Sequence, residues 1–240
     1  MSDRPVAPLE WNDELLASFW GYYAQHRQED YFTGLFGDRI LELTRRFYAA
    51  DAIVCDYGCG SGFLLEKLLR SHRAAGCDLS EDNLAAVRRR VGNHPNLVAT
   101  FRVGSPPVDM RFDALYAVET VEHVLARHEE GFFHNLAELL RPGGVVVVTT
   151  PHAENLDAEI VFCPGCRHTF HRWQHVRSFD ADTLAGFFAQ RGFEPISVFT
   201  TDFAARSPWR RLKARLRPAL GRVNPHLVYA GRRRADGATG

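Results

Sequence analysis

The sequence predicts an α/β fold in which a mostly parallel sheet is doubly wound, with helices on both faces. Three observations predict it. An apolar run at 52–55 leads through a glycine-rich turn into apolar residues at helical spacing. A second apolar run ends in Asp78, 22 residues after Asp56, which ends the first. Apolar runs and helix-like segments then alternate further along the chain, as in a sheet built from strand-helix-strand units.

The glycine turn is the most informative local feature. Gly58, Gly60 and Gly62 alternate along it, and glycine is needed where the backbone takes a positive φ or a ligand approaches closely. The helix that follows offers free N–H groups at its start. The spacing differs from the Gly-x-Gly-x-x-Gly of dinucleotide sites, so a dinucleotide is not expected. A plain strand-to-helix turn would show the same glycines.

Residues 56–62, Asp-Tyr-Gly-Cys-Gly-Ser-Gly, decide between these alternatives, because they resemble the first motif of the class I S-adenosylmethionine-dependent methyltransferases. The resemblance extends over roughly residues 30 to 200 and includes segments at 111–115, 140–144 and 191–193. It implies a Rossmann-like, mostly parallel, seven-stranded sheet and an enzyme that transfers a methyl group.

The resemblance also implies which residues hold S-adenosylmethionine. In this family an acid at the end of the second strand binds the ribose hydroxyls, and Asp78 occupies that position. A further acid after the third strand often faces the adenine, but Ser105 stands in that region here. The expected cofactor-binding residues are Asp56, Gly58, Gly60, Gly62, Asp78, Leu79 and Ser105.

The N-terminal part is rich in aromatic residues and predicts helices at about 12–26 and 34–49. Residues 1–50 would form a helical cap over the cofactor site. Tyr31 and Phe32 lie at the break between the two helices and are the expected cofactor-side residues. Plain packing of the helices on the sheet is the alternative.

The rest of the 240-residue chain divides into a core and a tail. Residues 51–205 are expected to form the methyltransferase core, with a Cys/His-containing insertion on the substrate side at about 152–178. Residues 206–222 form a basic amphipathic segment, which either contacts an anionic membrane surface or packs on its own domain. Residues 226–230 would form an edge strand, and 232–240 a disordered tail.

Charge and composition restrict the partners and the compartment. The formal net charge is +0, so no global field attracts nucleic acid. No apolar run is long enough to resemble a membrane span or a signal peptide, and a cytoplasmic protein is expected. Five cysteines, an odd number, favour reduced thiols or a metal site over a disulfide framework.

Two carboxylates and an imidazole follow the fourth strand. On a helical turn, Glu119, Glu122 and His123 would share one face and fit a divalent ion with oxygen and nitrogen ligands. This Glu-x-x-Glu-His resembles the metal motif of ubiquinone-biosynthesis O-methyltransferases and small-RNA 2′-O-methyltransferases, which implies a magnesium-type ion and a later histidine, here His175. Without a metal, His123 and Glu119 would act as catalytic residues, with His123 as general base. A structural role is the third reading.

A second candidate metal site lies in the insertion. Cys163 and Cys166 flank a Pro-Gly turn, and His168 and His171 follow closely. Two thiolates and two imidazoles at this spacing fit a structural zinc ion. Two free thiols in a substrate loop, or a redox pair, are the alternatives.

The function expected from these features is O-methylation of a small-molecule metabolite, at a sugar or phenolic hydroxyl, with S-adenosylmethionine and, in one reading, Mg or Zn. N- or C-methylation stays open. The alternatives are an RNA 2′-O-methyltransferase and a non-catalytic cofactor-binding or membrane-associated partner. Exposed apolar residues in the N-terminal helices would also allow a homodimer.

Overall fold

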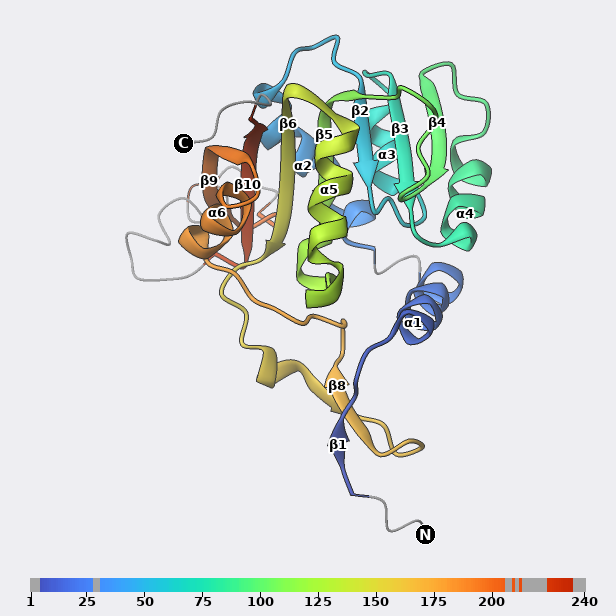
Figure 1. The fold of residues 1–240 in the computed structure, drawn as a ribbon, viewed down its shortest axis with the longest axis vertical. Coiled ribbons are helices and arrows are strands. Elements are labelled where there is room, and N and C mark those ends of the chain that lie inside the picture. Colours follow the sequence, from blue (N-terminus) through green and yellow to red (C-terminus); the bar gives the residue numbers. More distant parts are fainter. Residues whose placement is uncertain (1–4, 28–30, 206–208, 210–211, 213–223, 235–240) are drawn as a thin grey trace.

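The computed structural model describes residues 5–27, 31–205, 209, 212 and 224–234 (Figure 1). Its α-helices are α1 (Asp13–His26), α2 (Phe32–Thr44), α3 (Phe63–Leu68), α4 (Glu81–Val91), α5 (Glu129–Leu139) and α6 (Ala181–Ala189). Its strands are β1 (Ala7–Pro8), β2 (Val54–Tyr57), β3 (Ala74–Asp78), β4 (Leu97–Arg102), β5 (Phe112–Val118), β6 (Leu140–Pro151), β7 (Ile160–Phe162), β8 (His168–His171), β9 (Phe193–Thr201) and β10 (His226–Arg233). The 3-10 turns are η2 (Arg45–Phe47), η3 (Val121–His123), η4 (Ala126–His128) and η5 (Leu156–Glu159).

Seven strands form the main sheet, in the order β4-β3-β2-β5-β6-β10-β9. The first five are parallel to one another, and β10 runs antiparallel to both of its neighbours. This confirms the predicted seven-stranded, mostly parallel sheet. Figure 1 shows α5 and α6 in front of the sheet and α2 and α3 behind it, so helices cover both faces as predicted.

The strands of the sheet centre are buried on both faces, which explains why they read as continuous apolar runs. In β6, Val146 and Val148 face the core layer under α5 and α6, whereas Val145 and Val147 face the layer under α2, α3 and α4. All four valines are at most 3% exposed. Alternate side chains of one strand therefore bind the two helical layers to one sheet.

The last strand differs from its prediction. β10 lies between β6 and β9, with hydrogen-bonded neighbours on both sides, and Leu227 and Tyr229 are fully buried. The prediction of an edge strand was wrong, because a strand late in the sequence was assumed to add at the outside. β9 is the edge strand instead. Arg232 and Arg233, expected in a disordered tail, belong to β10.

Other terminal predictions fall largely outside the described residues. Of the basic segment at 206–222, Trp209 and Leu212 alone are described; both are helical and exposed. Residues 235–240 of the expected tail are not described. Within the described ranges, none of the helices has the length and apolar character needed to cross a bilayer.

A small three-stranded sheet, with the order β1-β8-β7, projects beyond the main sheet. The arrows of β2 and β3 point toward the end of the molecule where α1 and this small sheet lie (Figure 1). The segment after β6 thus emerges at the carboxyl edge of the strands, where ligands bind in open α/β sheets. β1 pairs in parallel with β8, so the N-terminus joins the insertion in one unit.

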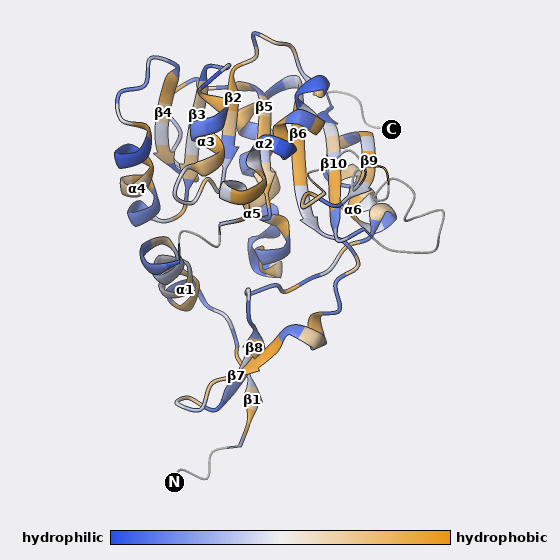
Figure 2. Cartoon of the chain, turned by 180° about the vertical axis from the view of Figure 1, so that it is seen from behind, coloured by the Kyte–Doolittle hydropathy of each residue, from blue (hydrophilic) through white to orange (hydrophobic). Residues whose placement is uncertain are grey.

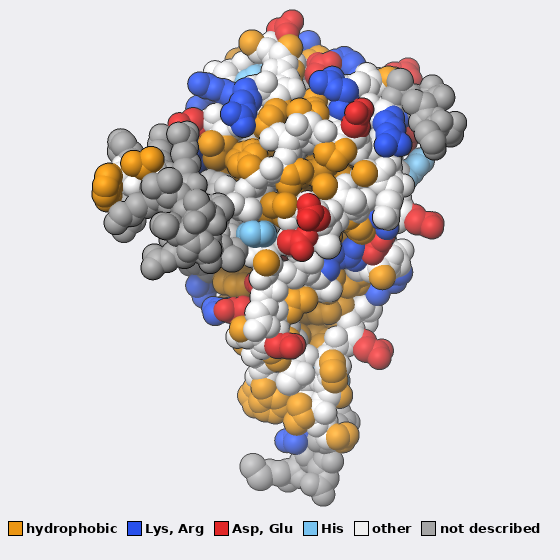
Figure 3. Space-filling model, turned by 90° about the vertical axis from the view of Figure 1, so that its left-hand side faces the viewer, with side chains coloured by type: hydrophobic (Ala, Val, Ile, Leu, Met, Phe, Trp, Pro, Cys, Tyr) orange, Lys and Arg blue, Asp and Glu red, His pale blue; other side chains and the backbone are white. Residues whose placement is uncertain are grey.

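The small sheet exposes apolar side chains. Ile160, Val161 and Phe162 of β7 are 45%, 37% and 48% exposed. The hydropathy colouring of Figure 2 shows β7 as an apolar strand, and Figure 3 shows apolar side chains gathered on the projecting part.

Candidate functional site

The glycine turn begins directly after β2. Gly58, Gly60 and Gly62 have φ angles of 72°, 52° and 82°, as the pattern of glycines predicts. The N–H groups of Gly58 and Cys59 donate to the carbonyl of Cys77, at 2.8 and 3.0 Å. These bonds fix the turn against β3, so the turn and the end of β3 form one rigid unit.

Tyr31 lies against this turn. A Cβ added to Gly60 would come within 2.5 Å of the Tyr31 ring, and that ring also lies against Phe63, with 5.8 Å between centroids. Burial raises the pKa of the Tyr31 hydroxyl to about 12. Phe32, expected beside it, packs on Phe203 and His226, and its place on the cofactor side stays a prediction.

Asp78 holds the turn from the neighbouring strand. Its Oδ2 accepts from the Gly60 N–H at 2.9 Å, and its Oδ1 accepts from the Ser80 N–H at 2.9 Å and the Asn83 amide at 3.0 Å. Burial raises the pKa of this carboxyl, and these bonds oppose the rise. Asn83 was missed from the sequence, where it looks like an ordinary residue of the first turn of a helix.

Asp56 lies within β2 rather than at its end, which is Tyr57. It is 2% exposed, and its Oδ2 has no hydrogen-bond partner in the described part of the chain. Burial raises the pKa of Asp56 to about 7. Leu79 follows Asp78 and is 67% exposed, and Ser105 is exposed just after β4. The predicted cofactor residues thus all lie at the carboxyl ends of β2, β3 and β4.

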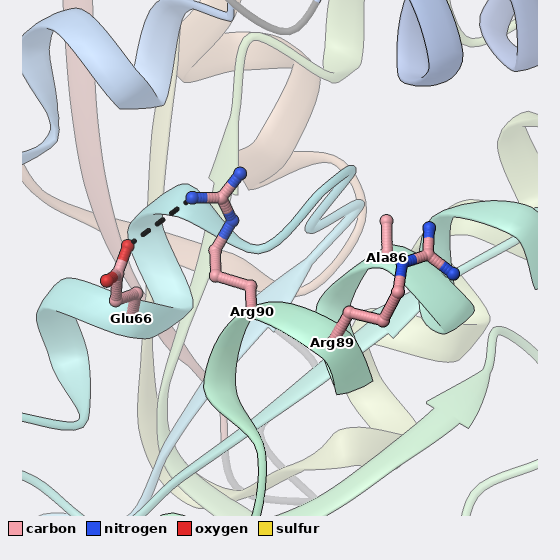
Figure 4. Close-up of a pocket in the computed structure, with 4 residues that line it drawn as sticks. All are labelled: Glu66, Ala86, Arg89 and Arg90. Atoms are coloured by element: carbon pink, nitrogen blue, oxygen red, sulfur yellow. Dashed lines mark ion pairs between the residues drawn. The ribbon is translucent and has the colours of Figure 1, made fainter.

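Arg90 supports the turn from outside. Its Nε donates to the Ser61 carbonyl at 2.8 Å, and its guanidinium lies 3.6 Å from the centre of the Phe63 ring. Figure 4 shows the shallow pocket that Arg90 lines with Glu66, Ala86 and Arg89, and its ion pair with Glu66 at 3.6 Å. None of the predicted site residues lines this pocket, which lies between α3 and α4.

Glu119 follows β5 and does not belong to a helical turn. Its φ of 46° turns the chain before η3 begins at Val121. The prediction that Glu119, Glu122 and His123 share one helical face was therefore wrong. The Thr149 hydroxyl donates to Glu119 Oε1 at 2.7 Å. Burial raises the pKa of Glu119 to about 7 despite this bond.

Glu122 is fully buried, and neither of its carboxylate oxygens has a hydrogen-bond partner in the segments that the structure describes. Burial, reinforced by the nearby charge of Glu119, raises the pKa of Glu122 well above its ordinary range. Burying a carboxylate without a partner destabilises the folded protein by roughly several kcal/mol, unless a bound proton or a cation compensates its charge. Both oxygens of Glu122 thus lack a partner in hydrogen-bonding geometry among the described residues, although the Thr150 side chain is close enough to oppose the rise in its pKa.

His123 lies beside Glu122, and Gln174 holds it from both ends. The His123 Nδ1 is 3.4 Å from the Gln174 carbonyl, and the Gln174 amide donates to the His123 carbonyl at 3.1 Å. Trp20 of α1 donates to the Gln174 side chain at 3.2 Å and meets the His123 ring edge-on, with 4.7 Å between centroids. Burial, followed by the charge of His175, lowers the pKa of His123 to about 3.

His175 completes a group of three, as predicted. Glu122, His123 and His175 each offer a ligand atom, and these atoms lie within 4.8 Å of one another. Glu119, the fourth predicted ligand, is not in this group. A second group at the same spacing contains Glu154, His171 and His175. Glu154 was missed from the sequence, although its place directly after β6, at the carboxyl edge, was a usable signal.

The predicted zinc ligands are not gathered in one place. Cys163 and Cys166 lie on the turn between β7 and β8, where N–H groups of Cys166 and Gly165 bond the Cys163 sulfur and lower the pKa of its thiol. His168 begins β8, whereas His171 ends it, pairs with Ile160 and belongs to the group with Glu154. Because β8 is extended, it separates His171 from the two cysteines, which a compact loop would have brought together. All five cysteines are free thiols.

Comparisons with known proteins agree with this arrangement. A family model described as a methyltransferase domain matches residues 23–198. A ubiquinone biosynthesis O-methyltransferase from Bradyrhizobium diazoefficiens is 36% identical over 102 residues, which are 40% of this chain and 39% of the relative. A trans-aconitate 2-methyltransferase from Acidovorax sp. (strain JS42) is 35% identical over 119 residues, which are 48% of this chain and 43% of the relative. The matched regions span less than half the length of these relatives.

One solved structure covers almost the whole chain. The 1,6-didemethyltoxoflavin-N1-methyltransferase of Burkholderia thailandensis superposes with a TM-score of 0.67 over 96% of this chain and 94% of its own, at 20% identity, a likeness of fold. Because the family match runs from α1 into β9 and the seven-stranded topology agrees with it, the chain belongs to the methyltransferase domain family, among the class I S-adenosylmethionine-dependent methyltransferases.

Proposed function

We propose that this protein transfers the methyl group of S-adenosylmethionine to an oxygen atom of a small molecule, with a divalent cation at Glu122, His123 and His175. The observation that carries the proposal is the fully buried carboxylate of Glu122, which lacks any described hydrogen-bond partner beside two imidazoles. A cation at this point would compensate the charge. A carboxylate with two imidazoles suits zinc or manganese better than magnesium, which prefers oxygen ligands alone.

The cofactor would lie along the carboxyl edge of β2, β3 and β4. The glycine turn with Asp56 would take the methionine part, and Asp78 would accept from the ribose hydroxyls with the lone pairs that its protein bonds leave free. Leu79 would pack on the adenine, and Ser105 would face its edge. The position of Tyr31 against Gly60 supports a side chain that covers the cofactor.

The acceptor would bind between the cofactor and the histidines. A bound cation lowers the pKa of a coordinated hydroxyl and orients it. Glu119, with a pKa raised to about 7, can take up a proton near neutral pH. The remaining work is to hold the acceptor oxygen in line with the sulfonium methyl group. Trp20, Tyr23 and Trp173 form a chain of neighbouring rings beside His123, which favours a flat phenolic ring or the apolar face of a sugar.

The likeness to a ubiquinone biosynthesis O-methyltransferase supports oxygen as the acceptor. The test is radiolabelled methyl transfer from S-adenosylmethionine to a panel of catechols, phenols and sugars, with and without added Mn²⁺ or Zn²⁺. We expect a product only with the metal and an oxygen acceptor. Equal transfer in a chelator would remove the cation from the proposal, and would return His123 to the role of general base.

Cofactor binding can be measured without added metal, separately from the role of the cation. Calorimetric titration should give the same S-adenosylmethionine affinity in wild type and Glu122→Ala, since Glu122 belongs to the acceptor side. Glu159→Gln, an exposed glutamate paired with Arg172 on the same insertion, is the matched control. No cofactor binding in the wild type would contradict the whole proposal.

A further inference from the structure

His175 belongs to both groups of potential metal ligands, so one group must be preferred. Its Nδ1 lies 2.5 Å from Glu154 Oε2. Glu154 contacts the imidazoles of both His171 and His175, and an ionised carboxylate in that position can only accept. The His175 Nδ1 therefore carries the proton and donates it to Glu154. In a neutral imidazole the lone pair then lies on Nε2, the nitrogen left for a metal.

His171 shows the opposite pattern. Its Nδ1 accepts from the backbone N–H groups of Trp173 at 3.3 Å and His175 at 3.2 Å. A nitrogen that accepts two N–H groups holds a lone pair, so the proton of neutral His171 is on Nε2. That Nε2 faces Glu154 Oε1 at 3.5 Å. A protonated nitrogen cannot bind a metal, which removes the group of Glu154, His171 and His175 as a ligand set.

His123 agrees with His175. Its Nδ1 lies 3.4 Å from the Gln174 carbonyl, which can only accept, so its Nε2 also holds a lone pair. That Nε2 lies 3.9 Å from Glu122 Oε1. The Nε2 lone pair of His123 and the carboxylate of Glu122 thus lie together with the His175 ring in the group of Glu122, His123 and His175.

We propose that Glu154 is a positioning residue, which holds His175 as the Nδ1–H tautomer with Nε2 free, and that His171, whose Nδ1 accepts two backbone N–H groups, is not a metal ligand. Glu154 is suited to this role because its side chain is only 17% exposed and each of its oxygens faces one imidazole. The two imidazole rings are stacked on each other, with 4.5 Å between their centroids. Such carboxylate-histidine pairs fix the orientation of metal-binding imidazoles. The effect on metal affinity rests on the proposed function; the tautomer does not.

The tautomer is tested first, on metal-free protein labelled with ¹⁵N-histidine, by long-range ¹H–¹⁵N correlation. The His175 signals are identified by their loss in His175→Asn. We expect protonated Nδ1 at His175 and protonated Nε2 at His171. In Glu154→Ala, His175 should shift toward the Nε2–H form that free histidine prefers, whereas Glu159→Gln should change nothing. Protonated Nε2 at His175 in the wild type overturns the proposal, whatever the protein binds.

Metal affinity is tested second, by Mn²⁺ titration with electron paramagnetic resonance. Glu154→Ala should bind Mn²⁺ about 10 to 100-fold more weakly, and Glu154→Gln, which keeps an acceptor, should lie between it and the wild type. His171→Asn, which keeps an acceptor near Nδ1, should lose far less affinity than His123→Asn. Equal losses of Mn²⁺ affinity in His171→Asn and His123→Asn would show that His171 is a ligand, and would overturn its exclusion from the metal site. A wild type that binds no Mn²⁺ but shows the expected tautomers contradicts the proposed cation and leaves the role of Glu154 intact.

Discussion

The two halves of the proposed site, a cofactor side and an acceptor side, are built in different ways. The cofactor side consists of one short turn, three positive-φ glycines and the acid at the end of the next strand, joined largely by backbone N–H groups. The acceptor side joins side chains from α1, from the turn after β5 and from the insertion after β6. A site formed by backbone N–H groups tolerates most side-chain substitutions outside its glycines. A site formed by side chains depends on each residue that contributes one. The two halves should therefore fail independently.

The largest effect is expected at Glu122. Glu122→Gln should lower methyl transfer about 10³-fold, because the cation that lowers the pKa of the acceptor hydroxyl and orients it would lose its carboxylate ligand. Cofactor affinity, measured by calorimetry, should stay within about twofold. Metal-free Glu122→Gln should also unfold at a higher temperature than the wild type, because a neutral amide can be buried without the bound proton or cation that Glu122 needs. A parallel loss of cofactor affinity would show that the halves are one unit.

Gly60→Ala tests the cofactor side. The positive φ costs a non-glycine residue about 1–2 kcal/mol, and the added methyl group meets Tyr31. We expect cofactor affinity to fall about 10-fold while Mn²⁺ affinity is unchanged. Gly131→Ala is the matched control, because nothing lies within 4 Å of an added Cβ in that helix. A loss of Mn²⁺ binding in Gly60→Ala would break the comparison.

Glu119 gives a pH dependence to the acceptor side. Its pKa is raised to about 7 in the folded protein, so the folded state binds the proton more tightly than the unfolded state. The contribution of Glu119 to stability is therefore greatest at low pH and falls as pH rises through the window between its ordinary value and about 7. Urea unfolding of the metal-free protein at pH 5 and pH 8 measures its free energy of unfolding. Between these two pH values, that free energy should fall more in the wild type than in Glu119→Gln. The rate of methyl transfer by the wild type should rise with pH through the same window, and the rate of Glu119→Gln should vary less with pH.

The smallest effect is expected at the turn between β7 and β8. Cys163→Ser with Cys166→Ser should leave cofactor and Mn²⁺ affinities unchanged, because these thiols lie away from both halves. In the native wild type, iodoacetamide should label these two thiols rapidly and spare the buried Cys55, Cys59 and Cys77. Mass spectrometry of the labelled peptides checks this. A drop in metal content in the double variant would restore a role for the cysteines in zinc binding.

What the sequence predicted follows the same division. The glycines, Asp78 and the sheet could be predicted because strand, turn and helix are local patterns and the turn needs positive φ wherever it occurs. Glu154 and Gln174 could not, because their contacts depend on how the insertion at about 152–178 folds back over η3. The wrong prediction of an edge strand at 226–230 has the same cause, since local periodicity does not contain the order of strands in the sheet.

The pairing of β1 with β8 has a consequence for the order of folding. It joins residues about 160 positions apart through two short backbone contacts, Ala7 N–H to Arg167 and Leu9 N–H to Thr169, at 3.4 and 2.8 Å. The entropy of closing so large a loop is recovered only once the sheet already holds the two ends close. We therefore expect β1 to pair with β8 late in folding, after the main sheet that carries the glycine turn has formed.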